Sequence, residues 1–313
     1  NNVVSVPAQI ENTYEFQDLA LSSEYDSFYD DSYSLINQIN IVLERLSSLS
    51  FFTVQELDQL QAEMLALRAY AHYQLLLHYA QSISFSPSGD HLGIVYQQAT
   101  INVGVDFPER ATVQESYDLI KQDLDAALAL FQQAPFLENG NNISYLNPIN
   151  TRALYARIAL QMKDWNLAAT LANEVITQSN VTLTPQSDYL NQWQSTSALS
   201  ETLLQWSAPL NSDGAVSSSI AAYYFDRYAA SEDLINLYDN GDLRRQWYSS
   251  TSLPTQIGTT LENRTYYQVT KYQENSAVVG IRLTEVLLIR AEALERITPG
   301  NPTSLELLNL VRE

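Results

Sequence analysis

The chain has 313 residues, no cysteine and a net charge of −20, from 16 basic and 36 acidic residues. Such an excess of negative charge opposes binding to phosphate backbones and to anionic lipid headgroups. The lack of cysteine excludes disulfides, thiolate metal sites and cysteine nucleophiles. No uninterrupted apolar run exceeds six residues, whereas a membrane-spanning helix needs about 20.

Two long helices are predicted near the start of the chain, over residues 23–49 and 53–80. In both segments apolar residues recur at intervals of three and four, which places them on one helical face. Thr53 is a good N-cap, and Glu56 follows three residues later. This spacing predicts a capping box at the start of the second helix.

A third helix is predicted from Thr112 to Gln133, where Thr112 and Glu115 form a second capping box. Residues 151–178 then form a helical hairpin, with a turn at residues 163–165. Short connections of this kind favour antiparallel helix pairs.

The last predicted pair comprises residues 282–296 and 303–313, separated by a break that contains two prolines and a glycine. Thr303 and Glu306 predict a third capping box. The sequence around Arg290 repeats that around Arg68, with five of nine positions identical. The helical segments are therefore predicted to be related pairs separated by long insertions.

Those insertions are predicted to be irregular. Residues 82–110 are rich in Gly, Pro and Ser, and residues 180–280 lose the helical periodicity. Short alternating pieces there, such as residues 265–270, predict minor β-strands. Trp206 follows two leucines and is predicted to lie in a buried strand.

Most signals of catalysis are absent from the sequence. It has no glycine-rich phosphate loop, no dinucleotide-binding fingerprint and no Gly-x-Ser-x-Gly elbow. His72 and His78 lie six positions apart on one predicted helix, too far around its axis to share a metal. Residues 239–242 resemble part of a calcium loop but lack its further ligands, which favours a simple turn. We predict no catalytic residue, no metal and no cofactor.

Arg68, Arg157 and Arg290 lie within apolar helix faces. An arginine there can clamp a ligand, or it can pair with carboxylates and carbonyls between helices. We favour the structural interpretation for all three.

Aromatic residues are abundant between residues 180 and 280, and flat amphipathic rings suit sugar faces or peptide side chains. Trp193 and Trp247 have polar neighbours in the sequence and are predicted to be surface side chains. The predicted ligand-binding residues are Trp193, Trp247, Tyr223, Tyr224 and Tyr266.

Several motifs occur in the order found in the SusD/RagB family of outer-membrane nutrient-binding lipoproteins. Arg282–Ala293, followed by Leu308–Arg312, is similar to the family pattern R-L-x-E-x-x-L-I-x-A-E-A and L-N-x-V-R. The other matching segments are Gln61–Tyr73, Leu92–Tyr96, Thr112–Leu124, Asp242–Arg244 and Thr270–Tyr272. The chain therefore resembles this family over nearly its whole length.

The resemblance implies an all-α fold of about four tetratricopeptide-like helix pairs, with long irregular insertions and minor β-strands. It implies a single SusD-like domain over residues 1–313. The helical scaffold is expected at about 23–80, 112–178 and 282–313, and the irregular ligand-binding portion at about 82–110 and 180–280.

The resemblance further implies a non-enzymatic protein on the extracellular face of the outer membrane, with a lipid anchor attached upstream of residue 1. It is expected to capture oligosaccharides or polysaccharide and to deliver them to a SusC-type TonB-dependent transporter. Two alternatives remain: a peptide-binding member of the same family, and a helical-repeat interaction scaffold without a small-molecule ligand. A glycoside hydrolase with a helical core is a further, less favoured interpretation. Nucleic acid is not an expected partner.

Overall fold

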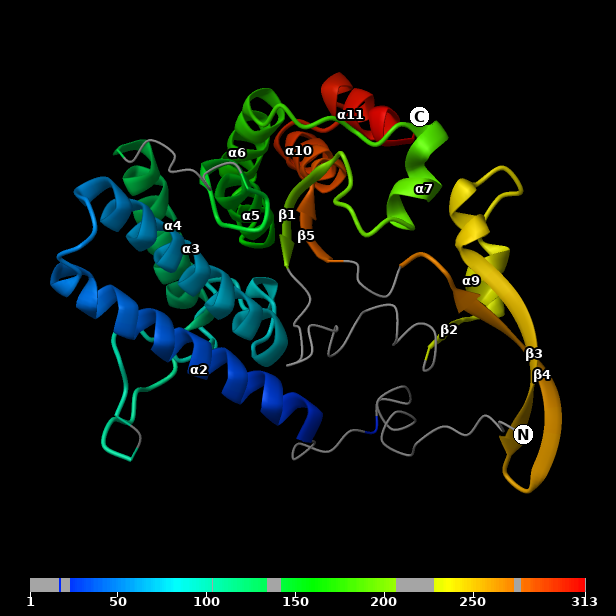
Figure 1. Ribbon diagram of the computed structural model, residues 1–313, viewed down its shortest axis with the longest axis horizontal. Helices are drawn as coiled ribbons and strands as arrows, with labels where there is room; N and C mark the ends of the chain where they lie inside the picture. The colour runs from blue at the N-terminus through cyan, green and yellow to red at the C-terminus, as the bar shows by residue number, and fades with distance from the viewer. Residues whose placement is uncertain are drawn as a thin grey trace. The chain divides into compact units, whose positions relative to one another are not determined.

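The computed structural model describes residues 17, 23–102, 104–133, 142–206, 228–272 and 277–312 (Figure 1). Contacts divide the chain into two compact units. We call them the helical unit (residues 23–181, 202–204 and 280–313) and the second unit (residues 1–22, 182–201 and 205–279). The sequence predicts a single domain, and this division into two contact units leaves that expectation a prediction.

Helices α2 (Ser23–Arg45) and α3 (Val54–Tyr79) form the first helix pair of the helical unit (Figure 1). A short 3₁₀ turn, η1 (Leu46–Ser48), ends the first of them. The Glu56 carboxylate accepts the Thr53 backbone N–H at 2.7 Å, and the Thr53 hydroxyl accepts the Glu56 N–H at 3.3 Å. The first predicted capping box and both predicted helices are thus confirmed.

Helix α4 (Val113–Gln133) packs on α3. Its start is the second predicted capping box. The Glu115 carboxylate accepts the Thr112 backbone N–H at 2.9 Å, and the Glu115 backbone N–H donates to the Thr112 hydroxyl at 3.1 Å. The same bonds lower the pKa of Glu115, with the backbone bond from Thr112 as the largest cause.

Helices α5 (Pro148–Gln161) and α6 (Trp165–Gln178) form the predicted hairpin. The first of them begins three residues before the predicted Thr151. Asn147 is its N-cap, because the Asn147 side chain accepts two backbone N–H groups at 3.0 Å each. Pro148 fits the first helical position, where no N–H is needed.

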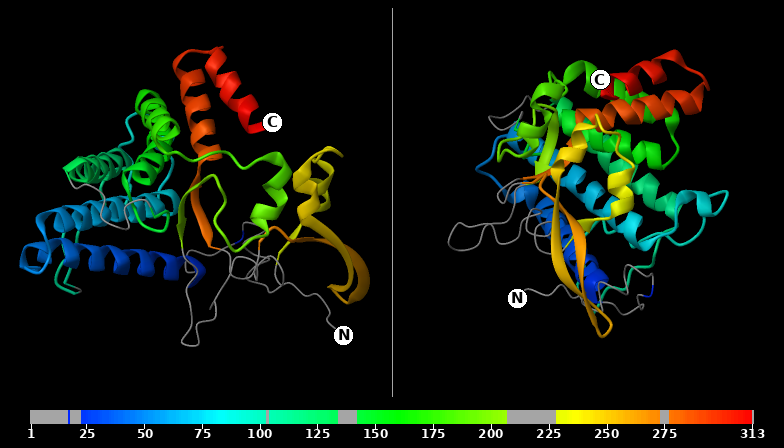
Figure 2. Two further views of the ribbon diagram at one scale, coloured as in Figure 1. Left: turned by 45° about the horizontal axis from the view of Figure 1, so that its top comes forward. Right: turned by 90° about the vertical axis from the view of Figure 1, so that its right-hand side faces the viewer.

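Helices α10 (Leu283–Ile297) and α11 (Pro302–Arg312) form the last pair (Figure 2). The prediction of a third capping box at Thr303 and Glu306 is wrong. The helix already begins at Pro302, and the Asn301 side chain accepts the Thr303 N–H at 3.0 Å. An Asn before a Pro at the helix start therefore serves as the cap in place of the threonine.

Small side chains allow these helices to approach one another closely. Alanines with no exposed surface recur on α3, α4, α5, α6 and α10. They are Ala62, Ala69, Ala127, Ala153, Ala156, Ala159, Ala168, Ala172 and Ala293. Large residues such as Leu75, Ile120 and Leu154 fill the spaces between them, so the core has the dense packing expected of a protein interior.

The segment 82–110, predicted to be irregular, is bound to the helical unit by its contacts. It contains the short turn η2 (Ile83–Phe85). The Gly93 N–H donates to the Ala111 carbonyl at 2.7 Å. A Cβ atom at Gly93 would lie 2.5 Å from the Ser116 Oγ, nearer than packed atoms come, so only glycine fits this approach.

The second unit contains the antiparallel sheet β2-β4-β3, formed by β2 (Ala229–Ala230), β3 (Tyr248–Ile257) and β4 (Thr260–Val269). The turn between β3 and β4 has Gly258 at a φ of 58°, a conformation that glycine adopts without strain. The strand predicted at residues 265–270 is confirmed as part of β4.

Strands β1 (Thr202–Trp206) and β5 (Val278–Arg282) form a two-stranded sheet. Trp206 lies in the predicted strand, whose first three residues are buried, while Trp206 itself at the strand end is half-buried. The second unit also contains η3 (Gln186–Asp188), α7 (Tyr189–Trp193), α9 (Glu232–Asn236) and η4 (Leu243–Trp247). Of the helices in the described ranges, none has the length and apolar character that a membrane span requires.

Candidate functional site

The second unit contains a cluster of aromatic rings around a small apolar core. Trp193, Leu199 and Trp247 are its buried members. Partly buried residues pack around them: Tyr189, Leu190, Tyr248, Tyr272 and Val279. We call these eight residues, together with Lys271, the aromatic cluster.

Short helical turns position the two tryptophans. Tyr189 and Trp193 are four residues apart on α7, so both side chains lie on one face. Trp247 ends η4, whose start is capped by Asp242. The Thr270 N–H and hydroxyl donate to the Trp247 carbonyl at 2.7 and 3.0 Å, which holds the segment after β4 against this turn.

The rings meet at angles that favour aromatic contacts. The Trp193 and Trp247 ring centroids are 6.2 Å apart at 72°, and those of Trp193 and Tyr272 are 5.7 Å apart at 85°. Edge-to-face pairs of this kind contribute about 0.5–1.5 kcal/mol beyond their buried area. The cluster is therefore a packed base for the side chains around it.

Lys271 lies across the cluster. Its Nζ is 3.6 Å from the Trp193 ring centroid, 5.0 Å from that of Trp247 and 5.2 Å from that of Tyr272. A cation above an aromatic face is attracted by the negative face of the ring, and tryptophan attracts it most strongly. Sequence reasoning singled out neither Lys271 nor Tyr272 as a site residue, although both belong to one of the segments that carried the family resemblance.

The prediction that Trp193 and Trp247 are surface side chains is wrong. They are 6% and 4% exposed, respectively. Polar neighbours in the sequence misled the prediction, because successive residues of a helical turn point in different directions. That Trp193 and Trp247 contact a ligand stays a prediction.

The other predicted site residues have different outcomes. Tyr223 and Tyr224 lie outside the described residues. Tyr266 is half-buried on β4, with its hydroxyl 2.7 Å from the Thr255 hydroxyl. This bond fixes the tilt of the Tyr266 ring on the sheet.

A polar margin borders the aromatic cluster. The Tyr238 and Tyr248 hydroxyls are 3.2 Å apart, and the Arg244 guanidinium lies 5.3 Å from the Tyr238 ring centroid. The Arg244 side chain pairs with Asp242 at 2.6 Å, and this hydrogen bond lowers the pKa of the Asp242 carboxyl. The margin thus combines ring faces with a fixed guanidinium.

The turn predicted at residues 239–242 is confirmed, because the Asp242 N–H donates to the Asp239 carbonyl at 3.0 Å. In the described part of the chain, no three His, Asp or Glu side chains are grouped as metal ligands would be.

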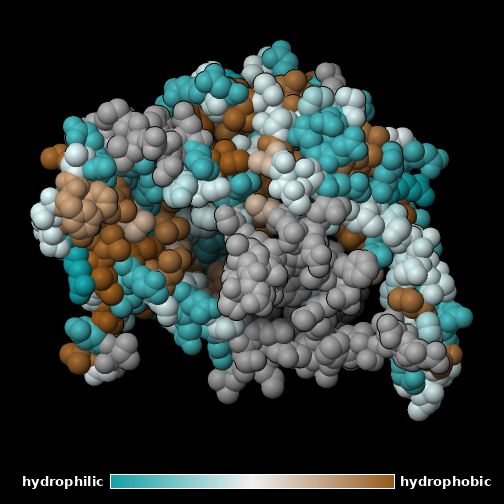
Figure 3. All heavy atoms as spheres, viewed as in Figure 1, coloured by the Kyte–Doolittle hydropathy of each residue, from teal (hydrophilic) through white to brown (hydrophobic). Residues whose placement is uncertain are grey.

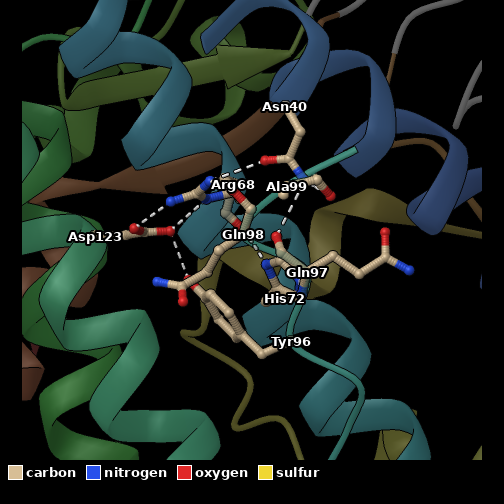
Figure 4. A network of polar contacts seen from close by, with 8 residues as sticks. All are labelled: Asn40, Arg68, His72, Tyr96, Gln97, Gln98, Ala99 and Asp123. Carbon is tan, nitrogen blue, oxygen red and sulfur yellow. Dashed lines mark hydrogen bonds and ion pairs between the residues drawn. The ribbon is translucent and has the colours of Figure 1, made fainter. Parts of the chain in front are cut away.

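Buried polar residues of the helical unit form a second ordered constellation (Figure 4). The Arg68 guanidinium donates to both oxygens of Asp123 at 2.7 Å. Its third nitrogen donates to the Asn40 side chain at 2.8 Å and to the Gln98 carbonyl at 3.0 Å. Arg68 therefore links α2, α3, α4 and the loop after α3.

His72 and Tyr96 complete this network. Tyr96 donates to Asp123 at 2.6 Å, and its ring stacks on His72 with centroids 3.8 Å apart. The His72 Nδ1 donates to the Arg68 carbonyl at 2.9 Å, and the Nε2 accepts the Gln97 N–H at 3.0 Å. Burial lowers the pKa of His72 to about 3, so the ring is neutral.

Arg157 makes the corresponding link between α5 and α10. Its guanidinium donates to both oxygens of Glu285, at 2.5 and 2.8 Å, and to the Gly280 carbonyl at 2.7 Å. The predicted structural role is confirmed for Arg68 and Arg157, because each fork joins a carboxylate to a backbone carbonyl. Arg290 lies half-buried on α10.

Comparisons with known proteins agree on one family. The model of the SusD-like family, described as starch-binding and associating with the outer membrane, matches residues 2–160, half of the chain. A search of the curated proteins finds no match.

Solved structures share the fold. A SusD superfamily protein from Bacteroides thetaiotaomicron VPI-5482 is 21% identical with a TM-score of 0.73, and covers 90% of this chain and 64% of its own. A SusD-like carbohydrate binding protein from Bacteroides vulgatus ATCC 8482 is 19% identical with a TM-score of 0.74, over 90% of this chain and 60% of its own. A laminarin-binding SusD-like protein is 18% identical with a TM-score of 0.67, over 91% and 69%. This chain thus spans roughly three fifths of the length of the first two structures.

Proposed function

The chain belongs to the SusD/RagB family, and on this premise we propose that it binds oligosaccharides or polysaccharide at the cell surface. The observation that carries the proposal is the family match itself, whose description is starch-binding. A laminarin-binding protein of the same fold adds support. The aromatic cluster of the second unit supplies surfaces of suitable chemistry.

We place the ligand on the partly exposed tyrosines of the second unit. Their flat faces stack on the C–H faces of a sugar ring, and their hydroxyls hydrogen-bond its oxygens. The half-buried or exposed tyrosines in the described part of the second unit are Tyr189, Tyr228, Tyr238, Tyr248, Tyr266, Tyr267 and Tyr272. Arg244 and Asp242 at the margin offer donors and acceptors to sugar hydroxyls.

Trp193 and Trp247 then serve mainly as the buried support of these tyrosines. Trp247 retains one ligand-directed property: its buried Nε1 has no hydrogen-bond partner in the described part of the chain. A sugar hydroxyl that reached the cluster would satisfy this donor. Tyr223, Tyr224 and Tyr266 stay predicted ligand contacts.

The wider role follows from the family. We propose that the protein is lipid-anchored on the extracellular face of the outer membrane and passes its ligand to a SusC-type TonB-dependent transporter, without chemistry and without a cofactor. The helix pairs of the helical unit, among them α3–α4, α5–α6 and α10–α11, are proposed to be tetratricopeptide-like, about four in all. The net charge of −20 does not oppose a neutral glycan.

Native electrophoresis in gels containing starch or laminarin tests the proposal. The wild-type protein is expected to be retarded by at least one of the two polysaccharides. Tyr238→Ala and Tyr266→Ala are each expected to weaken binding about tenfold, a loss of roughly 1.4 kcal/mol. Tyr145→Ala is the matched control, because Tyr145 is a 45% exposed tyrosine of the helical unit.

The alternatives predict other results. A peptide-binding protein would bind a peptide library and ignore both polysaccharides, whereas an interaction scaffold would bind neither. A hydrolase would release reducing sugar from starch or laminarin, and we expect none. If Tyr238→Ala and Tyr266→Ala are both retarded as strongly as the wild-type protein, the tyrosines of the second unit do not form the binding site.

A further inference from the structure

A group of aromatic side chains lies at the end of the α2–α3 pair, away from the turn that connects the two helices. Phe28 and Tyr29 come from the start of α2, and His78 and Tyr79 from the end of α3. Because the two helices are antiparallel, these ends meet. We call these four residues the aromatic platform.

The rings of the platform contact one another across the helix pair. The Phe28 centroid is 4.8 Å from that of His78 and 6.3 Å from that of Tyr79, and the Phe28 and Tyr79 planes are only 19° apart. Tyr29 meets Tyr79 edge-on at 5.2 Å. Tyr33 supports Tyr29, because their ring centroids are 4.6 Å apart. The Tyr33 hydroxyl itself donates to the Val95 carbonyl at 3.0 Å.

The platform is accessible to a ligand. Phe28 and Tyr29 are 38% and 39% exposed, and His78 is exposed beside them. Elsewhere along the pair, residues such as Ile36 and Leu75 have no exposed surface, whereas these rings stay partly in solvent. Exposed aromatic rings that are contiguous with one another, rather than scattered singly, are candidates for a binding surface.

Polar groups surround the rings. The His78 Nδ1 lies 2.7 Å from the Gln74 carbonyl and must donate to it, so in the neutral ring the Nε2 is an outward acceptor. The carboxylates of Asp26 and Asp30 are exposed and near enough to Tyr79 to raise the pKa of its hydroxyl, although burial is the larger cause. The platform therefore has apolar faces bordered by hydrogen-bond acceptors.

We propose that this platform is a second sugar-binding surface, separate from the aromatic cluster, on which a pyranose ring of a neutral glycan stacks. The proposal rests on the proposed function. A pyranose has C–H faces for Phe28 and Tyr29 and hydroxyl donors for the acceptors around them. A phosphate-bearing ligand would be repelled by Asp26 and Asp30, and the apolar face of a partner helix would leave these carboxylates without hydrogen bonds.

The platform offers a long glycan a further contact. A polysaccharide presents many pyranose rings to it, so the platform is expected to add to the affinity for polysaccharide.

The experiment compares ring variants at the two ends of the α2–α3 pair. Phe28→Leu retains apolar volume and loses the flat ring, and Phe28→Tyr restores the ring. The matched control is Phe51→Leu, at the connecting end of the pair. Apolar residues gather on the left of Figure 3. Phe51 is 77% exposed and packs on Phe52 with ring centroids 4.6 Å apart.

Two measurements on the full chain decide the proposal. The first is the affinity for starch or laminarin, by electrophoresis in polysaccharide gels, at low and high salt. The second is hydroxyl-radical footprinting of the platform side chains with and without polysaccharide. We expect Phe28→Leu to weaken polysaccharide binding three- to tenfold, Phe28→Tyr and Phe51→Leu to leave it unchanged, and the polysaccharide to protect Phe28, Tyr29 and Tyr79 from oxidation.

Other outcomes overturn the proposal. If wild-type protein is retarded but neither Phe28→Leu nor footprinting shows an effect, the platform is not a sugar surface, while the proposed function stands. If neither polysaccharide retards the wild-type protein, the proposed function fails and the platform proposal fails with it. Binding at the platform that disappears at high salt, or that a tetramethylammonium salt abolishes, would identify a cation site instead.

Discussion

Arg68 in the helical unit and Lys271 in the second unit are both cations placed among apolar side chains, yet the protein holds them in opposite ways. Arg68 is 5% exposed and meets its partners through directed hydrogen bonds to Asp123, Asn40 and Gln98. Lys271 is half-buried and lies on the faces of Trp193 and Trp247. The planar guanidinium matches a fork of acceptors, whereas an ammonium is a compact charge that the faces of aromatic rings attract.

The two cations therefore differ in what they do for the protein. The directed bonds of Arg68 join three helices and a loop, so they fix backbone positions. The ring contacts of Lys271 join short turns of the second unit, beside tyrosines that are only partly buried. We therefore expect the first arrangement to matter most for stability and the second to matter more for the binding surface.

The largest expected effect comes from removing the carboxylate partner of Arg68. Asp123→Ala leaves a buried guanidinium without its counter-charge, and breaking a buried pair in this way typically costs about 3–5 kcal/mol. Urea unfolding followed by circular dichroism measures the loss. Asp118→Ala is the control, since Asp118 is exposed on the same helix and its loss should cost no more than about 0.5 kcal/mol. If the two substitutions lower the free energy of unfolding equally, the Arg68 network does not stabilise the fold.

His72, which belongs to the Arg68 network, is expected to make the free energy of unfolding depend on pH. Its pKa falls from 6.5 in the unfolded chain to about 3 in the folded protein, so the unfolded state takes up the proton first. The His72 contribution to the free energy of unfolding is therefore complete above pH 6.5 and decreases as the pH falls toward 3. The slope is about 1.4 kcal/mol per pH unit, or roughly 2 kcal/mol between pH 6.5 and 5.

His72→Gln removes this titrating group. Wild-type protein is expected to lose about 2 kcal/mol more than the variant over that interval, measured as the difference between urea unfolding curves at the two pH values. The carboxylates that titrate in both proteins cancel in the comparison. Parallel pH profiles for the two proteins would show that the ring is not buried in the neutral form.

The smallest expected effect is at Lys271. Lys271→Met keeps the apolar stem and removes the charge above the rings, so it should cost about 1–2 kcal/mol and change the tryptophan fluorescence. Lys121→Met is the matched control, because Lys121 has a 39% exposed side chain and a distant ion pair with Asp164 at 3.9 Å. If the loss at Lys271 equals or exceeds the loss at Asp123, the contrast between the two regions fails.

The sequence predicted the helical unit well because its signals are local. Thr53 with Glu56, and Thr112 with Glu115, mark helix starts through contacts three residues apart. The structural role of Arg68 was also predicted, since a charge on an apolar face must be paired. Its partner could not be predicted, because Asp123 is one of 36 acidic residues and lies 55 positions away.

The candidate site was predicted less well, for a physical reason. The region rich in aromatic residues was recognised, but the assignment of individual rings to the surface failed at Trp193 and Trp247. In turns as short as α7 and η4 no periodic pattern indicates which face is buried. Burial there depends on packing against Tyr272 and Lys271, which come from a distant part of the chain.

By itself the sequence determined the helix pairs, two of their caps and the family, because these follow from local periodicity, short-range hydrogen bonds and ordered motifs. Only the tertiary structure decided which rings are buried, which carboxylate meets Arg68, and that Phe28 and Tyr29 meet His78 and Tyr79 at one end of the α2–α3 pair. Such contacts join residues about 50 positions apart. No local pattern encodes them, because they arise only when whole helices pack.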